Sequence, residues 1–79
     1  MESTEIINKL TNIFRNVFNN HSLVLTNELS ANDIAQWDSL SHMLLITEIE
    51  DNFSIKFKLK DLNKMRNVGD MIDIIISKL

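Results

Sequence analysis

The stretch that decides the fold is Asp38-Ser39-Leu40-Ser41-His42-Met43-Leu44-Leu45-Ile46-Thr47-Glu48-Ile49-Glu50-Asp51-Asn52. Its apolar residues recur every three or four positions, which is the spacing of side chains on a helix face. Either Asp38 or Ser39 can serve as the N-cap, because short polar side chains accept hydrogen bonds from the first free N–H groups. We therefore expect a helix that starts at Asp38–Ser39 and ends near Asn52.

This central helix carries two apolar stripes. One stripe, at helical spacing, consists of Leu45, Ile46, Ile49 and Phe53. The other consists of Leu40, Met43 and Leu44, with Thr47 continuing it. A helix on one side of a small bundle needs only one such stripe. The second stripe is therefore either additional core or a face for a ligand or a partner.

The flanking sequence predicts two more long helices. A first helix should run from about Thr4 to Asn19, capped by Ser3 or Thr4, and its buried face should comprise Ile6, Leu10, Ile13, Phe14 and Val17. A last helix should begin at Asn67, which has a capping-box spacing with Asp70. Gly69 in its first turn predicts close packing. The buried stripe of this helix should comprise Val68, Ile72, Ile75 and Leu79, widened by Met71 and Ile76.

Residues 20–37 form a long connection between the first two helices. Loops of this length are uncommon in a compact domain unless they are functional or anchored to the core. The expected anchors are Leu23, Val24, Leu25, Leu29 and Ile34. Residues Asp33 to Gln36 are expected to form a short helical turn.

After the central helix, apolar residues alternate with Lys56, Lys58 and Lys60, as in a strand. A lone strand has no partner here, so we expect an extended connector and then a short helix from Asp61 to Met65. The whole pattern predicts an all-α, small four-helix bundle with one long crossover. A single domain is expected over residues 1–79, because this length allows no more than one.

Composition excludes several classes of protein. The 79 residues include no cysteine, which excludes disulfides, thiolate metal sites and a cysteine nucleophile. The longest apolar run, Ile74 to Ile76, is far too short to span a membrane. The polar, acidic N-terminus does not resemble a secretory signal. We expect a soluble, cytoplasmic, monomeric protein.

Charge is distributed unevenly along the chain. Residues 16–55 contain six acids and no Lys or Arg, whereas residues 56–66 contain five basic residues and one acid. The two segments are either ordinary solvated faces or a dipolar surface that steers a charged partner. Nucleic-acid binding is not expected, because the basic segment is short, has one aromatic residue and belongs to an acidic protein.

The sequence lacks residues that the common types of catalytic site require. Neither His21 nor His42 has a second ligand at metal spacing, so no metal site is expected and both should be surface residues. Ser39 and His42 share a helix face, but a hydrolase would also need an oriented acid and an oxyanion hole. The sequence therefore predicts a protein that is not an enzyme.

Ser39 itself has two interpretations. In the first, Asp38 caps the helix and Ser39 is an ordinary first-turn residue. In the second, Ser39 is exposed at a helix N-terminus, where free N–H groups and the positive end of the dipole favour an attached phosphate.

The sequence Asp38-Ser39-Leu40 resembles the Asp-Ser-Leu attachment motif of acyl carrier proteins. Two later landmarks at matching spacing are similar to that family: Phe53-Ser54-Ile55-Lys56-Phe57 after the central helix, and Val68-Gly69-Asp70 at the start of the last helix. Upstream, residues 25–29 resemble the family's anchored loop. The resemblance covers residues 4–78.

The resemblance implies that Ser39 carries covalent 4′-phosphopantetheine, transferred from coenzyme A by a phosphopantetheinyl transferase. The arm's thiol would hold an acyl group as a thioester, as in fatty acid or polyketide biosynthesis, and Asp38 would belong to the motif. The implied partners are enzymes that load and consume the acyl group, and the apolar stripes of the second and last helices would partly shelter the acyl chain.

The sequence also departs from the family. Ser41, His42 and Leu44 stand where acids usually dock basic partners, and the segment after Phe53 is lysine-rich instead of acidic. We infer a carrier of a specialised pathway that docks through an apolar stripe, with the contact residues Leu40, Met43, Leu44, Thr47 and Glu48. Trp37, which replaces a small residue, is expected to be a buried loop anchor, with a docking role as the alternative.

Two other interpretations remain open from the sequence. A stand-alone peptidyl or aminoacyl carrier would share the fold and the arm. A cofactor-free helical interaction module would use Ser39 only as part of a helix cap.

Overall fold

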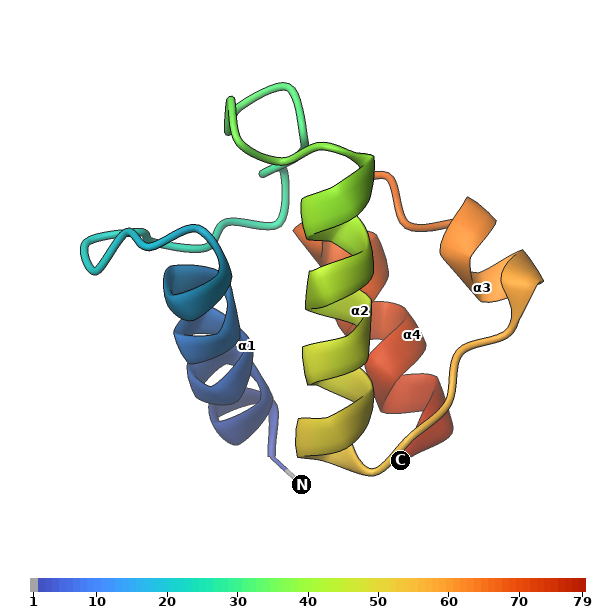
Figure 1. Cartoon of the computed structure of the whole chain (residues 1–79). Coiled ribbons are helices and arrows are strands. Elements are labelled where there is room, and N and C mark those ends of the chain that lie inside the picture. The colour runs from blue at the N-terminus through green and yellow to red at the C-terminus, as the bar shows by residue number, and fades with distance from the viewer. Residues whose placement is uncertain (1) are drawn as a thin grey trace.

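The computed structural model describes residues 2–79. This part of the chain forms four helices and no strand: α1 (Ser3–Val17), α2 (Ser39–Phe53), α3 (Leu59–Asn63) and α4 (Val68–Lys78). Figure 1 shows α1, α2 and α4 alongside one another, with the short α3 at the outer edge. The all-α class, the long connection before α2 and the short third helix confirm the predicted fold. Within residues 2–79, none of the helices has the length and hydropathy needed to cross a membrane.

The core lies where α1, α2 and α4 meet. The predicted stripe of α2 is buried throughout, and so is that of α1 apart from the half-buried Val17. On α4 the prediction was partly wrong: Val68, Met71 and Ile75 are buried, whereas Ile76 and Leu79 are about half exposed. The face of α4 toward the core is centred on Met71, and Leu79 follows the last helical residue, at the end of the chain.

Both ends of α1 and both ends of α3 were displaced from their predicted positions, and α3 ends at Asn63 instead of Met65. The N-cap of α1 is Glu2, which makes no side-chain cap bond, and not Ser3 or Thr4. The same helix ends at Val17 because Asn19 adopts a left-handed φ of 50°, which no α-helix can continue. Helix α3 starts two residues earlier than predicted, because the Asp61 carboxylate accepts a hydrogen bond from the Lys58 N–H at 2.8 Å.

The long connection is held against the core, as predicted, by most of its apolar residues. Ile34 is buried, and Leu23, Leu25 and Leu29 pack against the core as partly buried residues. Val24 is 69% exposed, so its predicted role as an anchor was wrong. The partly buried Leu23 and Leu25 on either side of Val24 supply the anchoring contacts instead. Residues 33–36 form turns and not a helical segment.

Gly69 allows this connection to approach α4 closely. Its N–H donates a hydrogen bond to the Asn27 carbonyl at 3.0 Å, and a Cβ atom on residue 69 would lie 3.2 Å from that oxygen. The predicted role of this glycine in close packing is confirmed.

Candidate functional site

The start of α2 is fixed by reciprocal hydrogen bonds between Asp38 and Ser41. The Ser41 N–H donates to Asp38 Oδ1 at 2.9 Å, and the Asp38 N–H donates to Ser41 Oγ at 2.8 Å. The Ser41 hydroxyl in turn donates to the Gln36 carbonyl at 2.8 Å. The bond from the Ser41 N–H holds the pKa of Asp38 below its usual value, so the cap is a carboxylate at neutral pH. The sequence predicted Asp38 as a cap but missed Ser41, because Glu or Gln usually occupies that position.

Ser39 is the first residue of α2 and is exposed. Within residues 2–79 its hydroxyl makes no hydrogen bond, in contrast to the hydroxyl of Ser41. The side chain is therefore accessible to solvent, and it sits at the positive end of a fifteen-residue helix. An anion bonded to this oxygen would be favoured by the helix dipole and by nearby N–H groups.

Trp37 anchors the residues immediately before Ser39. Its side chain is buried and packs edge-on against Phe14, with 5.3 Å between ring centroids, and against Phe18 at 5.9 Å. This confirms the interpretation of Trp37 as a loop anchor over a docking role. Because Trp37 is fixed to α1, the loop delivers Asp38 and Ser39 to a defined position.

His42 is half-buried, so the prediction of a surface residue was wrong. Its Nδ1 accepts a hydrogen bond from the Trp37 indole N–H at 3.1 Å, and the two rings stack with 6.1 Å between centroids. Burial lowers the pKa of His42, which favours the neutral ring. With Nδ1 acting as the acceptor, the ring proton resides on Nε2. His21 is exposed, as expected.

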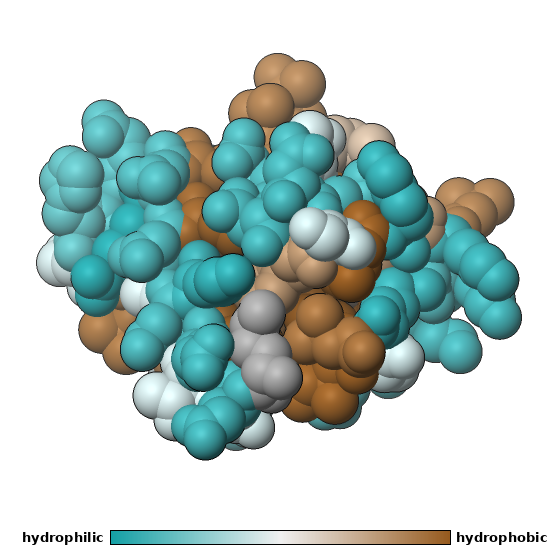
Figure 2. Space-filling model, turned by 90° about the horizontal axis from the view of Figure 1, so that it is seen from below, coloured by the Kyte–Doolittle hydropathy of each residue, from teal (hydrophilic) through white to brown (hydrophobic). Residues whose placement is uncertain are grey.

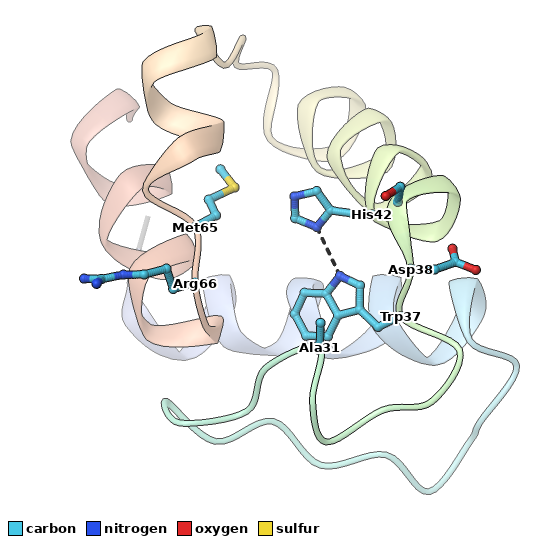
Figure 3. A pocket seen from close by; sticks show the side chains of 7 residues that line it. Ala31, Trp37, Asp38, His42, Met65 and Arg66 are labelled. Atoms are coloured by element: carbon cyan, nitrogen blue, oxygen red, sulfur yellow. Dashed lines mark hydrogen bonds between the residues drawn. The ribbon is translucent and has the colours of Figure 1, made fainter.

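A depression of about 370 Å³ lies beside Ser39. The long connection, α2 and the segment between α3 and α4 all contribute to its lining, which consists of Ala31, Trp37, Asp38, Ser39, His42, Met65 and Arg66. Figure 3 shows Trp37 and His42 on one side and Met65 on the other, with the Arg66 side chain directed away. Within residues 2–79 there is no cluster of three or more His, Cys, Asp or Glu that could hold a metal ion.

The second apolar stripe of α2 faces outward, which answers the question that the sequence left open. Leu40 is 74% exposed, Met43 53% and Leu44 52%, and the side chains of Thr47 and Glu48 are also exposed. These five residues, which we call the α2 stripe, contribute nothing to the buried core. The stripe begins one residue after Ser39.

The comparisons with known proteins agree with this geometry. No family model matches the chain. The chain is similar to the solution NMR structure of a holo acyl carrier protein from Geobacter metallireducens, with 54% sequence identity and a TM-score of 0.86. The match covers 91% of this chain and 83% of that one. From the fold, the capped and exposed Ser39 and this degree of identity, we conclude that the chain belongs to the acyl carrier protein family.

Proposed function

We propose that this protein carries an acyl group as a thioester on a 4′-phosphopantetheine arm attached to Ser39. The observation that carries the proposal is the exposed Ser39 hydroxyl, free of hydrogen bonds to residues 2–79, at the first position of a capped helix. The holo state of the similar Geobacter protein supports the assignment. The absence of cysteine fits it as well, because the reactive thiol would belong to the arm.

The attachment is a phosphoryl transfer from coenzyme A. Ser39 Oγ forms a bond to the phosphorus that bears the pantetheine, while the bond from that phosphorus to the bridging oxygen of the diphosphate breaks. Adenosine 3′,5′-bisphosphate leaves, and the serine proton passes to a base of the phosphopantetheinyl transferase. The phosphodiester keeps one negative charge, which the N-terminus of α2 stabilises by about 0.3–1 kcal/mol.

The protein would then present the acyl group and leave the chemistry to other enzymes. The α2 stripe is the surface on which we place the enzymes that load and consume the acyl group. Its three apolar side chains are more than half exposed and adjoin Ser39, so an enzyme that covers them also reaches the arm. We propose that the chain works as one monomeric domain in the cytoplasm, in a specialised pathway.

The test is the intact mass of the protein after incubation with coenzyme A, Mg²⁺ and a broad-specificity phosphopantetheinyl transferase. The chain should gain one phosphopantetheine, Ser39→Ala should gain none, and Ser22→Ala in the exposed loop should gain as much as the parent. Failure of the folded parent chain with two unrelated transferases would refute the attachment site and leave Ser39 as a first-turn helix residue only. If the site is modified, the identity of the acid that becomes loaded distinguishes an acyl from an aminoacyl carrier.

A further inference from the structure

A basic ledge runs along the outer flank of the molecule beside α3. We define it as Lys56, Lys58, Lys60, Lys64 and Arg66, all of which are exposed. Within residues 2–79, Arg66 has an ion pair with Asp70 at 3.6 Å, and the four lysines have none. Lys60 adds a Coulombic attraction to Asp61, but no ion pair within residues 2–79 accounts for the concentration of lysines in this segment.

The single acid in this segment is turned away from the surface. The Asp61 side chain is 13% exposed, and its Oδ2 lies 2.8 Å from Lys78 Nζ and accepts a hydrogen bond from the Lys58 N–H. The hydrogen bond with Lys78 is the main reason that the pKa of Asp61 is lowered. This carboxylate is paired with Lys78, Asp70 pairs with Arg66, and the Glu50 carboxylate accepts a hydrogen bond from the Phe57 N–H at 2.8 Å. The four exposed lysines therefore supply the excess positive charge of the ledge.

An apolar side chain projects from the middle of the ledge. Leu59 lies between Lys58 and Lys60, is the first residue of α3, and is 75% exposed. Helix α3 forms the outer edge of the molecule in Figure 1, and the same side, at the right in Figure 2, is largely hydrophilic with an apolar group at its rim. The exposed Leu59 therefore stands between two exposed lysines at the start of α3, which lies at the outer edge of the molecule.

We propose that the ledge docks on an anionic phospholipid surface. Four of its five cations are lysines, which act as point charges, whereas protein interfaces favour arginine and are depleted in lysine. Lysines close to a bilayer are attracted by its anionic headgroups, and an exposed leucine can enter the boundary between headgroups and acyl chains. A bilayer surface can accept such cations and one exposed leucine without a complementary pocket.

The net charge of −3 does not oppose this orientation. Screening limits repulsion to about 8 Å at physiological ionic strength, whereas the molecule measures 29 × 26 × 22 Å. Acids on faces away from α3 would therefore be screened from the bilayer. The expected binding is weak and sensitive to salt, because it rests on a few cations and one side chain.

Docking of the ledge would also place Ser39 near the bilayer. The ledge ends at Arg66, which with Met65 lines the depression beside Ser39. If Ser39 carries the arm, as proposed above, the acyl group would be delivered to an acceptor in or on the membrane. The docking itself does not depend on the arm.

The experiment is co-sedimentation with vesicles of phosphatidylglycerol and phosphatidylcholine in equal parts, compared with vesicles of phosphatidylcholine alone. The protein should bind the mixed vesicles at physiological ionic strength and be released at high salt. Lys60→Glu should weaken binding about tenfold, because each lysine near the surface contributes and the new carboxylate is repelled. Leu59→Ser, which keeps the charge, should weaken it about threefold or more.

Lys9→Glu on α1 is the matched control, because it changes the net charge equally on another element and should alter binding by less than about twofold. Ser39→Ala should bind like the parent chain, so failure of docking and failure of the attachment site are separate results. Equal binding to both vesicles, or equal weakening by Lys9→Glu and Lys60→Glu, would overturn the proposal. The ledge would then be interpreted as a contact site for an acidic protein surface.

Discussion

The two sides of the depression beside Ser39 are built in different ways. On one side, Trp37 and His42 are backed by the rings of Phe14 and Phe18, all within buried or half-buried packing. On the other side, Met65 and Arg66 follow the five-residue helix α3, which the ion pair between Asp61 and Lys78 connects to α4. The aromatic side fixes the position of Ser39, and we expect the α3 side to be the more adjustable one, because a five-residue helix and one ion pair hold it.

The largest effect should follow from breaking the aromatic side at its centre. Phe14 is fully buried and contacts both Phe18 and Trp37, so Phe14→Ala should lower the free energy of unfolding by about 3–5 kcal/mol. A domain of this size has little stability to spare, so this variant should be largely unfolded at physiological temperature. Urea denaturation followed by circular dichroism measures the change.

The control for this variant is Val24→Ala in the exposed part of the connection, which should change the free energy of unfolding by less than about 0.5 kcal/mol. If Phe14→Ala cost no more than this control, the aromatic cluster would not be what holds the loop.

Acidification should lower the free energy of unfolding by a smaller amount, through His42 on the same side of the depression. Because burial lowers the pKa of His42, the unfolded chain binds more protons than the folded chain below about pH 6.5. The stability supplied by the neutral ring is therefore complete above that pH and is lost as the pH falls toward the lowered pKa. Protonation at Nδ1 also removes the acceptor for the Trp37 indole N–H. Urea midpoints at several pH values, with NMR titration of the ring, test this.

His42→Gln separates the titration of His42 from that of other groups, because an amide oxygen can accept the indole hydrogen bond without titrating. Asp38 and Arg66 line the same depression, and Asp38 titrates only at more acidic pH because its pKa is lowered. If His42→Gln showed the same loss of stability between neutral pH and pH 5.5 as the parent chain, that loss would belong to another titrating group.

The smallest effect on global stability should come from the α3 side. Lys78→Met keeps the apolar stem of the side chain and removes its ammonium group from Asp61. Amide exchange should accelerate in residues 57–66 and stay unchanged in α1 and α2, because the pair joins α3 to α4 alone. Modification of Ser39 should be unaffected. If exchange in α1 and α2 rose equally, the two sides would form one cooperative unit.

The helical class was predictable because periodicity and caps agree along most of the chain. Asp38 and Asn67 stand at the starts of α2 and α4, and the buried stripes of α1 and α2 follow directly from their spacing. Leu59 shows where this reasoning fails. Its alternation with Ile55 and Phe57 indicates one apolar face, but the backbone turns into α3 at Leu59 and directs that side chain outward. A pattern of alternation does not reveal where extended backbone ends.

The candidate site was predictable only in part. The Asp38-Ser39-Leu40 motif located the exposed serine, but the contact between Trp37 and His42 joins residues five positions apart across a loop–helix boundary. No helical or strand period places such residues together. The orientation of the α2 stripe was also undetermined, because its apolar residues suit a core as well as an exposed docking face.

The position of Trp37 also gives the protein a natural fluorescent probe next to Ser39. It is the only tryptophan in the chain, and its indole lines the depression beside Ser39, so intrinsic fluorescence reports on this one location without a label. The chain has no cysteine, so any thiol titrated with a chromogenic reagent would measure unacylated arm directly. Tryptophan emission and thiol content could be followed together while the acyl group is loaded. The comparison would show whether the surroundings of Trp37 change at the same time as the thiol becomes acylated.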